Sequence, residues 1–321
     1  MPHVAITRRL PEGGLEPLRS AGYRCEVHDA DEAPSRGELL ALVAGADAVI
    51  TLLSDRVDDA FLDAAGPQLQ VVANYAVGLD NVDLDACTRR GVAVAHTPGV
   101  LTEATADLAF ALLLAVARRV VEGHRLASSD RWTGWQPLQL LGTSLHGRTF
   151  GVIGLGRIGE ATARRARAFG MEIVYAGRSD APRAEDVLGA RRLEIDALLG
   201  ASDVVSLHCP LTDDTRHMID GAALARMKRS AILINTARGE IVDEAALVEA
   251  LQAGRLRGAG LDVFEHEPSI HPGLTDLPNA VLTPHLGSAT VDVRTEMARV
   301  AADAVVAVLE GRDAPQLARR P

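Results

Sequence analysis

Three side chains in the last third of the chain could bind an anion and move a proton. Arg238 lies in INTARGEIVD, Glu267 in GLDVFEHEP and His285 in LTPHLGS, each just after an apolar run typical of a strand. The carboxyl ends of such strands line the ligand crevice of an open α/β sheet. A guanidinium fork can clamp a carboxylate, and a histidine can exchange a proton near neutral pH. A nearby carboxylate would favour the imidazolium form, which is ready to donate.

Other interpretations of these three residues stay open. Arg238 could cap a helix or form a salt bridge, Glu267 could be a solvated charge, and His285 could be a core histidine. Spacing alone does not exclude His266 as the acid. The further competing histidines are His208, His217 and His271.

A glycine-rich turn predicts a dinucleotide site. Gly154, Gly156 and Gly159 form GxGxxG between a strand-like run at 149–153 and a helical pattern at 157–169. The first glycine permits a tight turn, the second lets backbone approach phosphate, and the third lets the helix lie close to the strand. The helix N-terminus offers N–H groups to the pyrophosphate.

The end of the next predicted strand, 172–176, indicates which dinucleotide binds. An NAD site normally has an acid there, whereas this chain has Gly177, Arg178 and Ser179. A guanidinium can bind a 2′-phosphate that a carboxylate would repel. We therefore predict NADPH as the preferred cofactor, with NADH as an alternative if Asp180 acts as a displaced acid or Arg178 is only a solvated surface residue. With the three residues above, the prediction is hydride transfer to a 2-keto acid and protonation of the alkoxide.

Composition limits the class of protein. The 321 residues suggest two domains, and 47% apolar with 3% aromatic residues suits helices packed on parallel strands. The net charge of −10 argues against nucleic acid or anionic membranes as partners. The chain opens into strand-like VAIT, and its longest apolar run, 108–117, is about half of a membrane span. Cys25, Cys87 and Cys209 lack metal-ligand spacing and are expected to be buried thiols, with no metal site and a cytoplasmic location.

Alternating patterns predict two doubly wound α/β units with parallel sheets. Between them, after Thr97-Pro98-Gly99, we expect one long helix that Thr102 caps and that ends near Ser128. Trp132 and Trp135 follow in a polar loop, where they could anchor a subunit contact, cover a pocket or simply pack on the neighbouring helix. The expected strands are 4–7, 25–27, 48–52, 69–73, 92–95, 149–153, 172–176, 204–208, 231–235, 258–262 and 281–283. The expected helices of the first unit are 15–20, 36–44, 58–64 and 84–89, and a last helix spans 291–309.

Seven segments resemble the D-isomer-specific 2-hydroxyacid dehydrogenase family, and within it most of all the glyoxylate/hydroxypyruvate reductases. Together they indicate a resemblance that spans roughly residues 40 to 309. The segments are NYAVGLDNVD, TPGVLTEATADLAFALLLA, GRTFGVIGLGRIG, HCPLTDDTRHMI, INTARGEIVDEAAL, AGLDVFEHEP and LTPHLGSAT.

The resemblance implies roles for individual residues. Arg238 would bind the substrate carboxylate, His285 would protonate the substrate oxygen, and Glu267 would support the histidine. Backbone N–H groups of Val77 and Gly78 would also hold the carboxylate. The implied cofactor-binding residues are Leu155, Gly156, Arg157, Ile158, Gly177, Arg178, Ser179, Cys209, Pro210, Thr215, Thr236, Ala237, Asp262, His285 and Gly287.

The resemblance also implies an architecture. A Rossmann cofactor domain at 99–287 would be inserted into a flavodoxin-like substrate domain made of 1–98 plus 288–321. Relatives pair as homodimers through the cofactor domain. In some of them a tryptophan from the loop that matches 131–136 enters the partner's active site.

The substrate remains a choice among small 2-keto acids. Leu52, Leu53 and Ser54 offer a small, mostly neutral pocket wall, which suits glyoxylate or hydroxypyruvate better than pyruvate or a bulkier keto acid. Relatives that act on 3-phosphohydroxypyruvate commonly have a basic residue where Leu53 stands, so a 3-phosphoglycerate dehydrogenase is the weaker interpretation. A D-lactate-type dehydrogenase is a further alternative. A protein of another class, a dinucleotide-sensing corepressor, would bind the cofactor without appreciable turnover.

Overall fold

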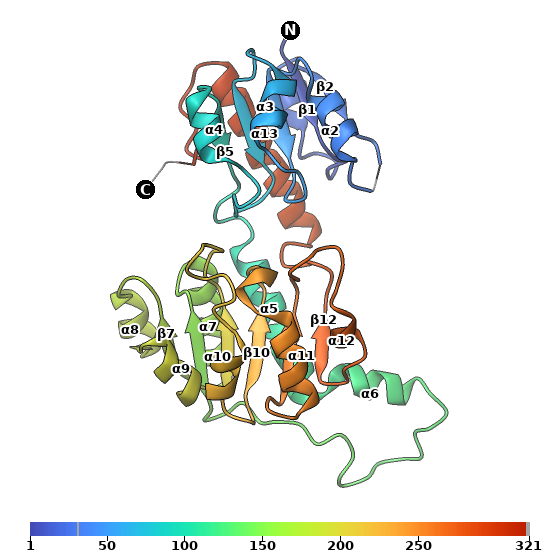
Figure 1. Cartoon of the computed structure of the whole chain (residues 1–321), viewed down its shortest axis with the longest axis vertical. Coiled ribbons are helices and arrows are strands. Elements are labelled where there is room, and N and C mark those ends of the chain that lie inside the picture. Colours follow the sequence, from blue (N-terminus) through green and yellow to red (C-terminus); the bar gives the residue numbers. More distant parts are fainter. Residues whose placement is uncertain (31, 319–321) are drawn as a thin grey trace. The chain divides into compact units, whose positions relative to one another are not determined.

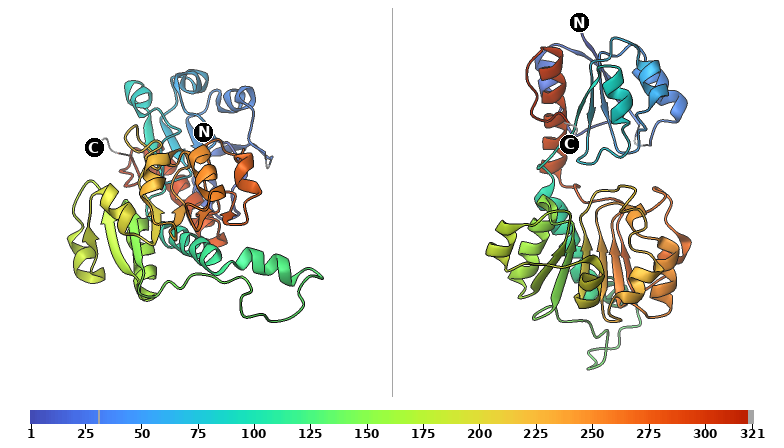
Figure 2. Two further views of the ribbon diagram at one scale, coloured as in Figure 1. Left: turned by 60° about the horizontal axis from the view of Figure 1, so that its bottom comes forward. Right: turned by 60° about the vertical axis from the view of Figure 1, so that its left-hand side comes forward.

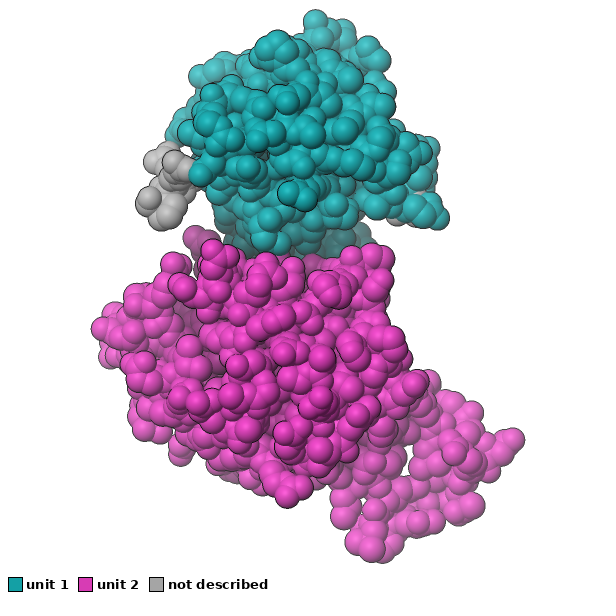
Figure 3. All heavy atoms as spheres, in the orientation of Figure 1, with its two compact units in different colours: residues 1–101, 288–321 teal, residues 102–287 magenta. Residues whose placement is uncertain are grey.

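Two parallel sheets, each packed between helices, form the framework of the protein. The computed structural model describes residues 1–30 and 32–318. The chain divides into unit 1, residues 1–101 with 288–321, and unit 2, residues 102–287 (Figure 3).

Within its described residues, unit 1 has a five-stranded parallel sheet in the order β2-β1-β3-β4-β5 (Figure 1). This is the flavodoxin-like order, as the sequence predicted. The strands are β1 (His3–Ile6), β2 (Arg24–Val27), β3 (Ala48–Thr51), β4 (Val71–Asn74) and β5 (Ala93–Ala95). The helices are α1 (Glu16–Ser20), α2 (Arg36–Val43), α3 (Asp59–Ala65), α4 (Leu84–Arg89) and α13 (Val291–Leu309).

The central strands β1, β3 and β4 are buried on both faces and read as apolar runs, whereas the edge strand β2 has exposed and half-buried residues in alternation. Val4 and Ile6 belong to one core cluster and Ala5, between them, to another. The C-terminal helix α13 packs on α1 and on β3, β4 and β5. The end of the chain thereby completes the unit in which the chain began.

Unit 2 has a seven-stranded parallel sheet in the order β12-β11-β10-β9-β6-β7-β8 among its described residues. Read from β8, the first six positions follow the Rossmann order 3-2-1-4-5-6, which confirms the predicted fold. The strands are β6 (Thr149–Ile153), β7 (Glu172–Ala176), β8 (Arg191–Arg192), β9 (Val204–Leu207), β10 (Ile232–Asn235), β11 (Gly258–Leu261) and β12 (Ala280–Leu282).

Helices cover both faces of this second sheet, and alternate residues point to opposite faces. On β7, Ile173 and Tyr175 join one cluster while Val174 and Ala176 join the other. Helix α5 packs against α7, β10 and β11. The helices are α5 (Thr102–Arg118), α6 (Val120–Ala127), α7 (Arg157–Ala168), α8 (Pro182–Leu188), α9 (Ile195–Ala201), α10 (Gly221–Arg226), η1 (Gly239–Ile241), α11 (Glu244–Gln252) and α12 (Pro272–Thr275).

The prediction of one long helix from Thr102 to about Ser128 was wrong. Thr102 is the first helical residue rather than a cap, and the helix ends at Arg118. Arg119 has φ +53°, in the left-handed region, so the chain turns before α6 begins. The guanidinium of Arg119 donates to both carboxylate oxygens of Glu122, at 2.9 and 2.5 Å, and so stabilises the break.

Helix α6 and the segment that follows it project from the rest of unit 2 (Figures 1 and 2). No residue of α6 is buried. Among the described helices, none is both long enough and apolar enough to cross a membrane.

Candidate active site

His285 and Glu267 form a direct pair at the carboxyl ends of β12 and β11. Nδ1 of His285 lies 2.8 Å from Oε2 of Glu267. The other carboxylate oxygen, Oε1, accepts a hydrogen bond of 3.1 Å from the Phe264 N–H. The side chains are 31% and 37% exposed, respectively, so both are accessible to a ligand. Glu267 is thus oriented by its own loop and in turn orients the imidazole.

The pKa of Glu267 lies below its ordinary value. Burial acts to raise this pKa, but the hydrogen bond to His285 and the charge of His285 outweigh it, with smaller contributions from the Phe264 N–H and, least of all, from the charge of Arg238. Glu267 is therefore ionised at neutral pH. An ionised carboxylate at Nδ1 favours a proton on that nitrogen and leaves Nε2 for a ligand.

The backbone around His285 is held in an uncommon conformation. His285 has φ +54°, and its N–H donates to the carbonyl oxygens of Asp262 and Thr283, at 2.9 and 3.0 Å. A non-glycine residue in the left-handed region costs roughly 1–3 kcal/mol and persists where surrounding contacts determine it. Such strain is typical of functional sites.

The carboxylate of Asp262 makes further hydrogen bonds that hold the backbone around His285. It is 1% exposed and accepts hydrogen bonds from the Thr283 hydroxyl at 2.6 Å, from the Leu286 N–H at 2.7 Å and from the Gly287 N–H at 2.8 Å. Burial raises the pKa of Asp262, although these hydrogen bonds and the charge of His285 oppose the shift. Asp262 therefore holds the loop that carries His285 and Gly287.

Arg238 follows β10 on a turn that Asn235 fixes. The side-chain amide of Asn235 donates to the Arg238 carbonyl at 2.8 Å, and its oxygen accepts from the Ala237 N–H at 3.0 Å. Nη1 of Arg238 donates to the Ala237 carbonyl at 2.8 Å. Arg238 follows β10, the strand that pairs with β11, and the loop after β11 carries Glu267. The structure thus brings the three predicted residues to one edge of the sheet.

The competing histidines lie in other settings. Burial lowers the pKa of His208 to about 4, and its Nε2 lies 2.8 Å from the Ser206 hydroxyl. His217 pairs with Glu265 at 2.5 Å, and Nδ1 of His271 accepts from the Gly273 N–H. His266 is exposed on the Glu267 loop, but Glu267 pairs with His285 instead.

The three glycines of the predicted dinucleotide turn have different surroundings. A Cβ on Gly154 would lie 2.5 Å from the Cys209 nitrogen, and one on Gly159 would lie 2.3 Å from the Gly154 carbonyl oxygen. Among the residues that the structure describes, a Cβ on Gly156 would meet nothing within 4 Å. Gly156 is also the N-cap of α7, so no side chain caps the first N–H groups of this helix. Gly154 and Gly159 therefore allow close packing, whereas Gly156 leaves open space at a helix N-terminus, which suits a phosphate.

The turn after β7 contains a second arginine contact that the sequence did not predict. Gly177, Arg178 and Ser179 are all exposed. Nη2 of Arg192, on β8, donates to the Gly177 carbonyl at 2.8 Å. Nη1 of Arg192 binds the Asp180 carboxylate at 2.8 Å. Asp180 is thus engaged by a guanidinium through one of its carboxylate oxygens.

The ends of β9 and β10 carry the other predicted cofactor residues of this crevice. Burial raises the pKa of the Cys209 thiol to about 11, so it is not a thiolate at neutral pH. The Thr215 hydroxyl donates to the Pro210 carbonyl at 2.8 Å and closes that loop. Within residues 1–30 and 32–318, the buried hydroxyl of Thr236 has no hydrogen-bond partner. An orphaned buried hydroxyl beside Arg238 fits a bound polar ligand.

The remaining cofactor positions flank the glycine turn. Leu155 and Ile158 are half-buried and Arg157 is exposed at the start of α7.

Of the three cysteines, Cys87 is buried as expected, whereas Cys25 and Cys209 are only half-buried, and all three are free.

The predicted substrate residues of unit 1 lie on two loops joined by asparagines. Leu53 and Ser54 follow β3, and Val77 and Gly78 follow β4. Asn81 donates to the carbonyls of Leu52 and Asp55, at 3.0 and 2.8 Å. Asn74 donates to the Gly78 carbonyl and to Asn81, at 2.9 and 3.0 Å. The two loops are therefore one connected structure.

A basic residue also lies beside this pair of loops. Nη2 of Arg8 donates to the Ser54 hydroxyl at 3.2 Å. The sequence prediction of a mostly neutral wall considered only the loop 52–54 and missed Arg8. The TRR run after β1 was the available signal, because it places arginines at the carboxyl end of a strand beside β3.

Comparison with known proteins identifies the family. Residues 110–287 match the D-isomer specific 2-hydroxyacid dehydrogenase, NAD binding domain. A glyoxylate reductase of Thermococcus litoralis is 49% identical over 99% of this chain and 97% of its own length. This chain belongs to the D-isomer specific 2-hydroxyacid dehydrogenases.

Solved structures agree with this family membership. A protein of Thermus thermophilus is 51% identical, with a TM-score of 0.93, over 99% of this chain and 100% of that one. An NADPH-dependent glyoxylate/hydroxypyruvate reductase of Sinorhizobium meliloti, in complex with NADP and malonate, is 33% identical with a TM-score of 0.85. That match covers 100% of this dehydrogenase-family chain and 99% of the other.

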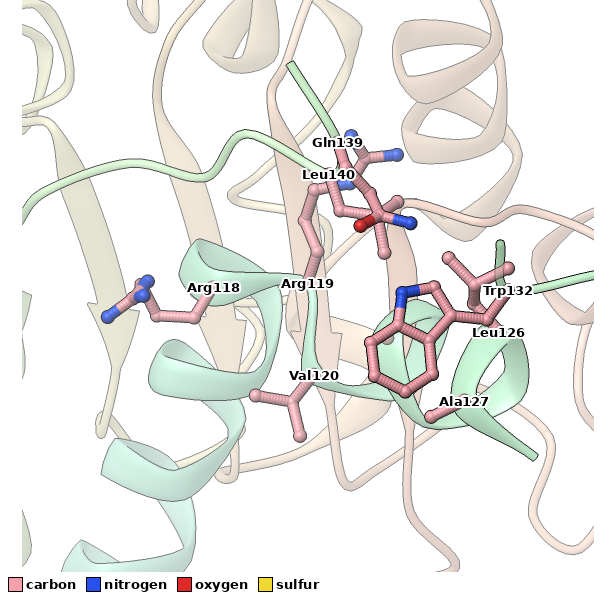
Figure 4. A pocket seen from close by; sticks show the side chains of 9 residues that line it. Arg118, Arg119, Val120, Leu126, Ala127, Trp132, Gln139 and Leu140 are labelled. Carbon is pink, nitrogen blue, oxygen red and sulfur yellow. The ribbon is translucent and has the colours of Figure 1, made fainter. Parts of the chain in front are cut away.

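Trp132 and Trp135 lie on the projecting segment of this dehydrogenase-family chain. Trp135 is 83% exposed, so simple packing does not explain it. Trp132 is 55% exposed and lines an open pocket of about 320 Å³, where its indole lies beside Leu126 and Ala127 of α6 (Figure 4).

Proposed function

We propose that this chain uses NADPH to reduce glyoxylate and hydroxypyruvate to the D-2-hydroxy acids, with His285 as the general acid. The observation that carries the proposal is the His285–Glu267 pair, with Arg238 at the end of the neighbouring strand β10. The glyoxylate reductases among its relatives support the substrate. The neutral side chain of Leu53 is consistent with a small keto acid.

The roles of the residues follow from their chemistry. Arg238 binds the carboxylate of the keto acid and polarises the neighbouring carbonyl. A bound nicotinamide dinucleotide supplies the hydride that adds to C2. His285, protonated on both nitrogens, donates the proton on Nε2 to the developing alkoxide and becomes neutral. Glu267 keeps the proton on Nδ1 and holds the ring in place.

Other residues hold the reactants. Leu53, Ser54, Val77 and Gly78 are the proposed substrate-binding residues of unit 1. Thr236, Gly287 and the amides at the start of α7 are proposed to bind the dinucleotide. The orphaned Thr236 hydroxyl and the open space at Gly156 support this fit.

The preference for NADPH rests on the turn after β7. Arg178 is exposed there, and the nearby Asp180 is paired with Arg192. Two guanidinium groups close to the turn favour a 2′-phosphate, whose charge a free carboxylate would repel. The Sinorhizobium meliloti relative, described as NADPH-dependent, points the same way.

A second substrate class is favoured by Arg8. Its guanidinium lies beside Ser54, on the loop that we propose to contact the substrate. A cation there would suit a keto acid with an anionic group at C3, such as 3-phosphohydroxypyruvate. Glyoxylate, which has no such group, would gain nothing from it.

We also propose that the chain forms a homodimer through unit 2. Five large apolar side chains between residues 120 and 141 are more than half exposed. Exposed apolar surface of this extent marks interaction sites. The five are Val120, Trp132, Trp135, Leu138 and Leu141.

Measurement of the molecular mass in solution tests this proposal. The wild type should have twice the chain mass, and the double variant Trp135→Asp with Leu138→Asp should be a monomer. A wild-type monomer would contradict the proposal.

One assay tests the proposed activity. NADPH and NADH oxidation would be followed by absorbance with glyoxylate, hydroxypyruvate, 3-phosphohydroxypyruvate and pyruvate at matched concentrations. Faster oxidation of NADPH with the first two supports the proposal. Preference for the phosphorylated substrate, lost in Arg8→Ala, would favour the second class. Tight NADPH binding without turnover on any keto acid would instead indicate a dinucleotide-sensing protein.

A further inference from the structure

Glu244 is a buried acid whose position helix capping does not explain. It is 4% exposed, although it stands on the first turn of α11. Glutamate is almost never fully buried unless it is paired. The cap of α11 is Asp243, whose side chain accepts from the Ala246 N–H at 2.9 Å. Glu244 must therefore have another structural partner.

That partner is Glu265, and the contact is reciprocal. Oε1 of Glu244 accepts a hydrogen bond of 2.9 Å from the Glu265 N–H. Oε2 of Glu265 accepts one of 3.2 Å from the Glu244 N–H. Each carboxylate thus binds the backbone of the other residue. Hydrogen bonds from a backbone N–H to a carboxylate are among the stronger ones in proteins.

The pair joins the two loops that carry Arg238 and Glu267. Gly239, next to Arg238, packs so closely on the second loop that a Cβ there would lie 1.9 Å from the Phe264 carbonyl carbon. The Phe264 N–H in turn donates to Glu267. The loop after β10 and the loop after β11 are therefore in direct contact from Gly239 to Glu244.

His217 adds a third segment to the same junction. Its Nε2 lies 2.5 Å from Oε1 of Glu265, and its backbone N–H donates to the Glu240 carbonyl at 2.8 Å. His217 thus contacts both loops. With Oε1 of Glu265 engaged by this histidine, Oε2 is directed at Glu244.

We propose that Glu244 and Glu265 are positioning residues for the reduction. They hold the loop of Arg238, which binds the substrate carboxylate, at a fixed position relative to the Glu267–His285 pair, which donates the proton. The inference rests on the proposed function. Neither glutamate needs to touch the substrate. Misplacement of a reacting group by about 1 Å can cost on the order of 100-fold in rate, so a junction two residues from Glu267 can control turnover.

The test compares three variants of the full chain on glyoxylate with NADPH. Glu244→Ala removes the acceptor, Glu244→Gln keeps an acceptor oxygen, and Glu249→Ala is a matched control on the same helix, where the side chain is 77% exposed. We expect Glu244→Ala to lower kcat by roughly 10- to 100-fold. NADPH affinity should stay at the wild-type value, and Glu244→Gln and Glu249→Ala should stay near wild-type kcat.

The pH profile separates positioning from stability. In Glu244→Ala the alkaline limb of kcat/KM should move to lower pH, because a displaced Glu267 supports the imidazolium of His285 less well. A lower Tm with wild-type kcat and an unmoved limb would overturn the inference. If Glu244→Ala does not fold, Glu265→Ala is measured with the same expectations. A wild-type chain that reduces no keto acid overturns the proposed function, and the inference with it, whereas an active wild type with unaffected variants overturns the inference alone.

Discussion

His285 holds its imidazole 2.8 Å from the carboxylate of Glu267 while its own backbone stays in the left-handed region, at φ +54°. The buried carboxylate of Asp262 determines that backbone by binding the next two N–H groups. One acid therefore orients the ring and another fixes the loop. The proposed proton donor is positioned before any ligand binds.

Replacing Glu267 should shift the pH dependence of turnover. Reduction needs His285 protonated, so activity falls as pH rises and the imidazolium is lost. Glu267→Gln removes the negative charge beside Nδ1 of His285, and the alkaline limb of kcat/KM should move to lower pH. The neighbouring Glu265 is not a neutral control, so exposed Glu249→Ala serves instead. An unmoved limb in Glu267→Gln would show that the pair does not support the acid.

The same residue should affect stability in acid. The pKa of Glu267 is lowered in the folded chain from an ordinary value of 4.5. A carboxyl with a lowered folded pKa stabilises the fold above its unfolded pKa, and this contribution is lost as pH falls through the folded pKa. The Tm difference between wild type and Glu267→Gln should therefore shrink below about pH 4.5. Thermal melts from neutral pH to about pH 3 measure it, and a difference that grew in acid would contradict the assigned direction.

Two glycines of the dinucleotide turn should respond differently to the same substitution. Gly159→Ala places a Cβ 2.3 Å from the Gly154 carbonyl oxygen and should lower Tm. The Cβ of Gly156→Ala would meet no atom of the described residues within 4 Å, so Tm should stay unchanged while NADPH affinity falls. Calorimetry and fluorescence titration give both quantities. Wild-type NADPH affinity in Gly156→Ala would show that phosphate does not approach that backbone.

Cofactor preference should follow the turn after β7. Gly177→Asp with Arg178→Ala supplies an acceptor for the ribose hydroxyls and removes a cation, so the ratio of kcat/KM for NADPH over NADH should fall by at least about tenfold. Arg183→Ala, in a side chain 80% exposed on α8, is the control and should leave the ratio unchanged. A double variant with wild-type selectivity would place the 2′-phosphate site elsewhere.

The fold was predictable because the central strands of both sheets are buried on both faces. Strands such as Val204–Leu207 then read as short apolar runs, and the prediction placed each strand of unit 1 within two residues of its observed bounds. The prediction of one helix from residue 102 to about residue 128 was wrong because the sequence pattern is helical on both sides of Arg119. Only the positive φ of Arg119 and its contact with Glu122 mark the break. The two-residue strand Arg191–Arg192 is exposed and polar, so periodicity gave no signal for it.

The site was predictable to the extent that its residues follow strands. Arg238, Glu267 and His285 each follow one, and their side chains converge at the sheet edge. Arg8, Arg192 and Glu244 were missed because their partners are distant in sequence, by 46, 15 and 21 positions. Charged side chains without periodicity look like solvated surface, and only tertiary contacts distinguish them.

The central claim is that His285 donates the proton. Steady-state reduction of glyoxylate by His285→Ala tests it most directly, beside His266→Ala as a matched control from the neighbouring loop and with NADPH affinity measured for both. The account predicts that kcat falls by roughly two to four orders of magnitude in His285→Ala, with NADPH affinity kept and the His266 variant near wild type. Wild-type kcat in His285→Ala, or a loss confined to His266→Ala, would contradict it.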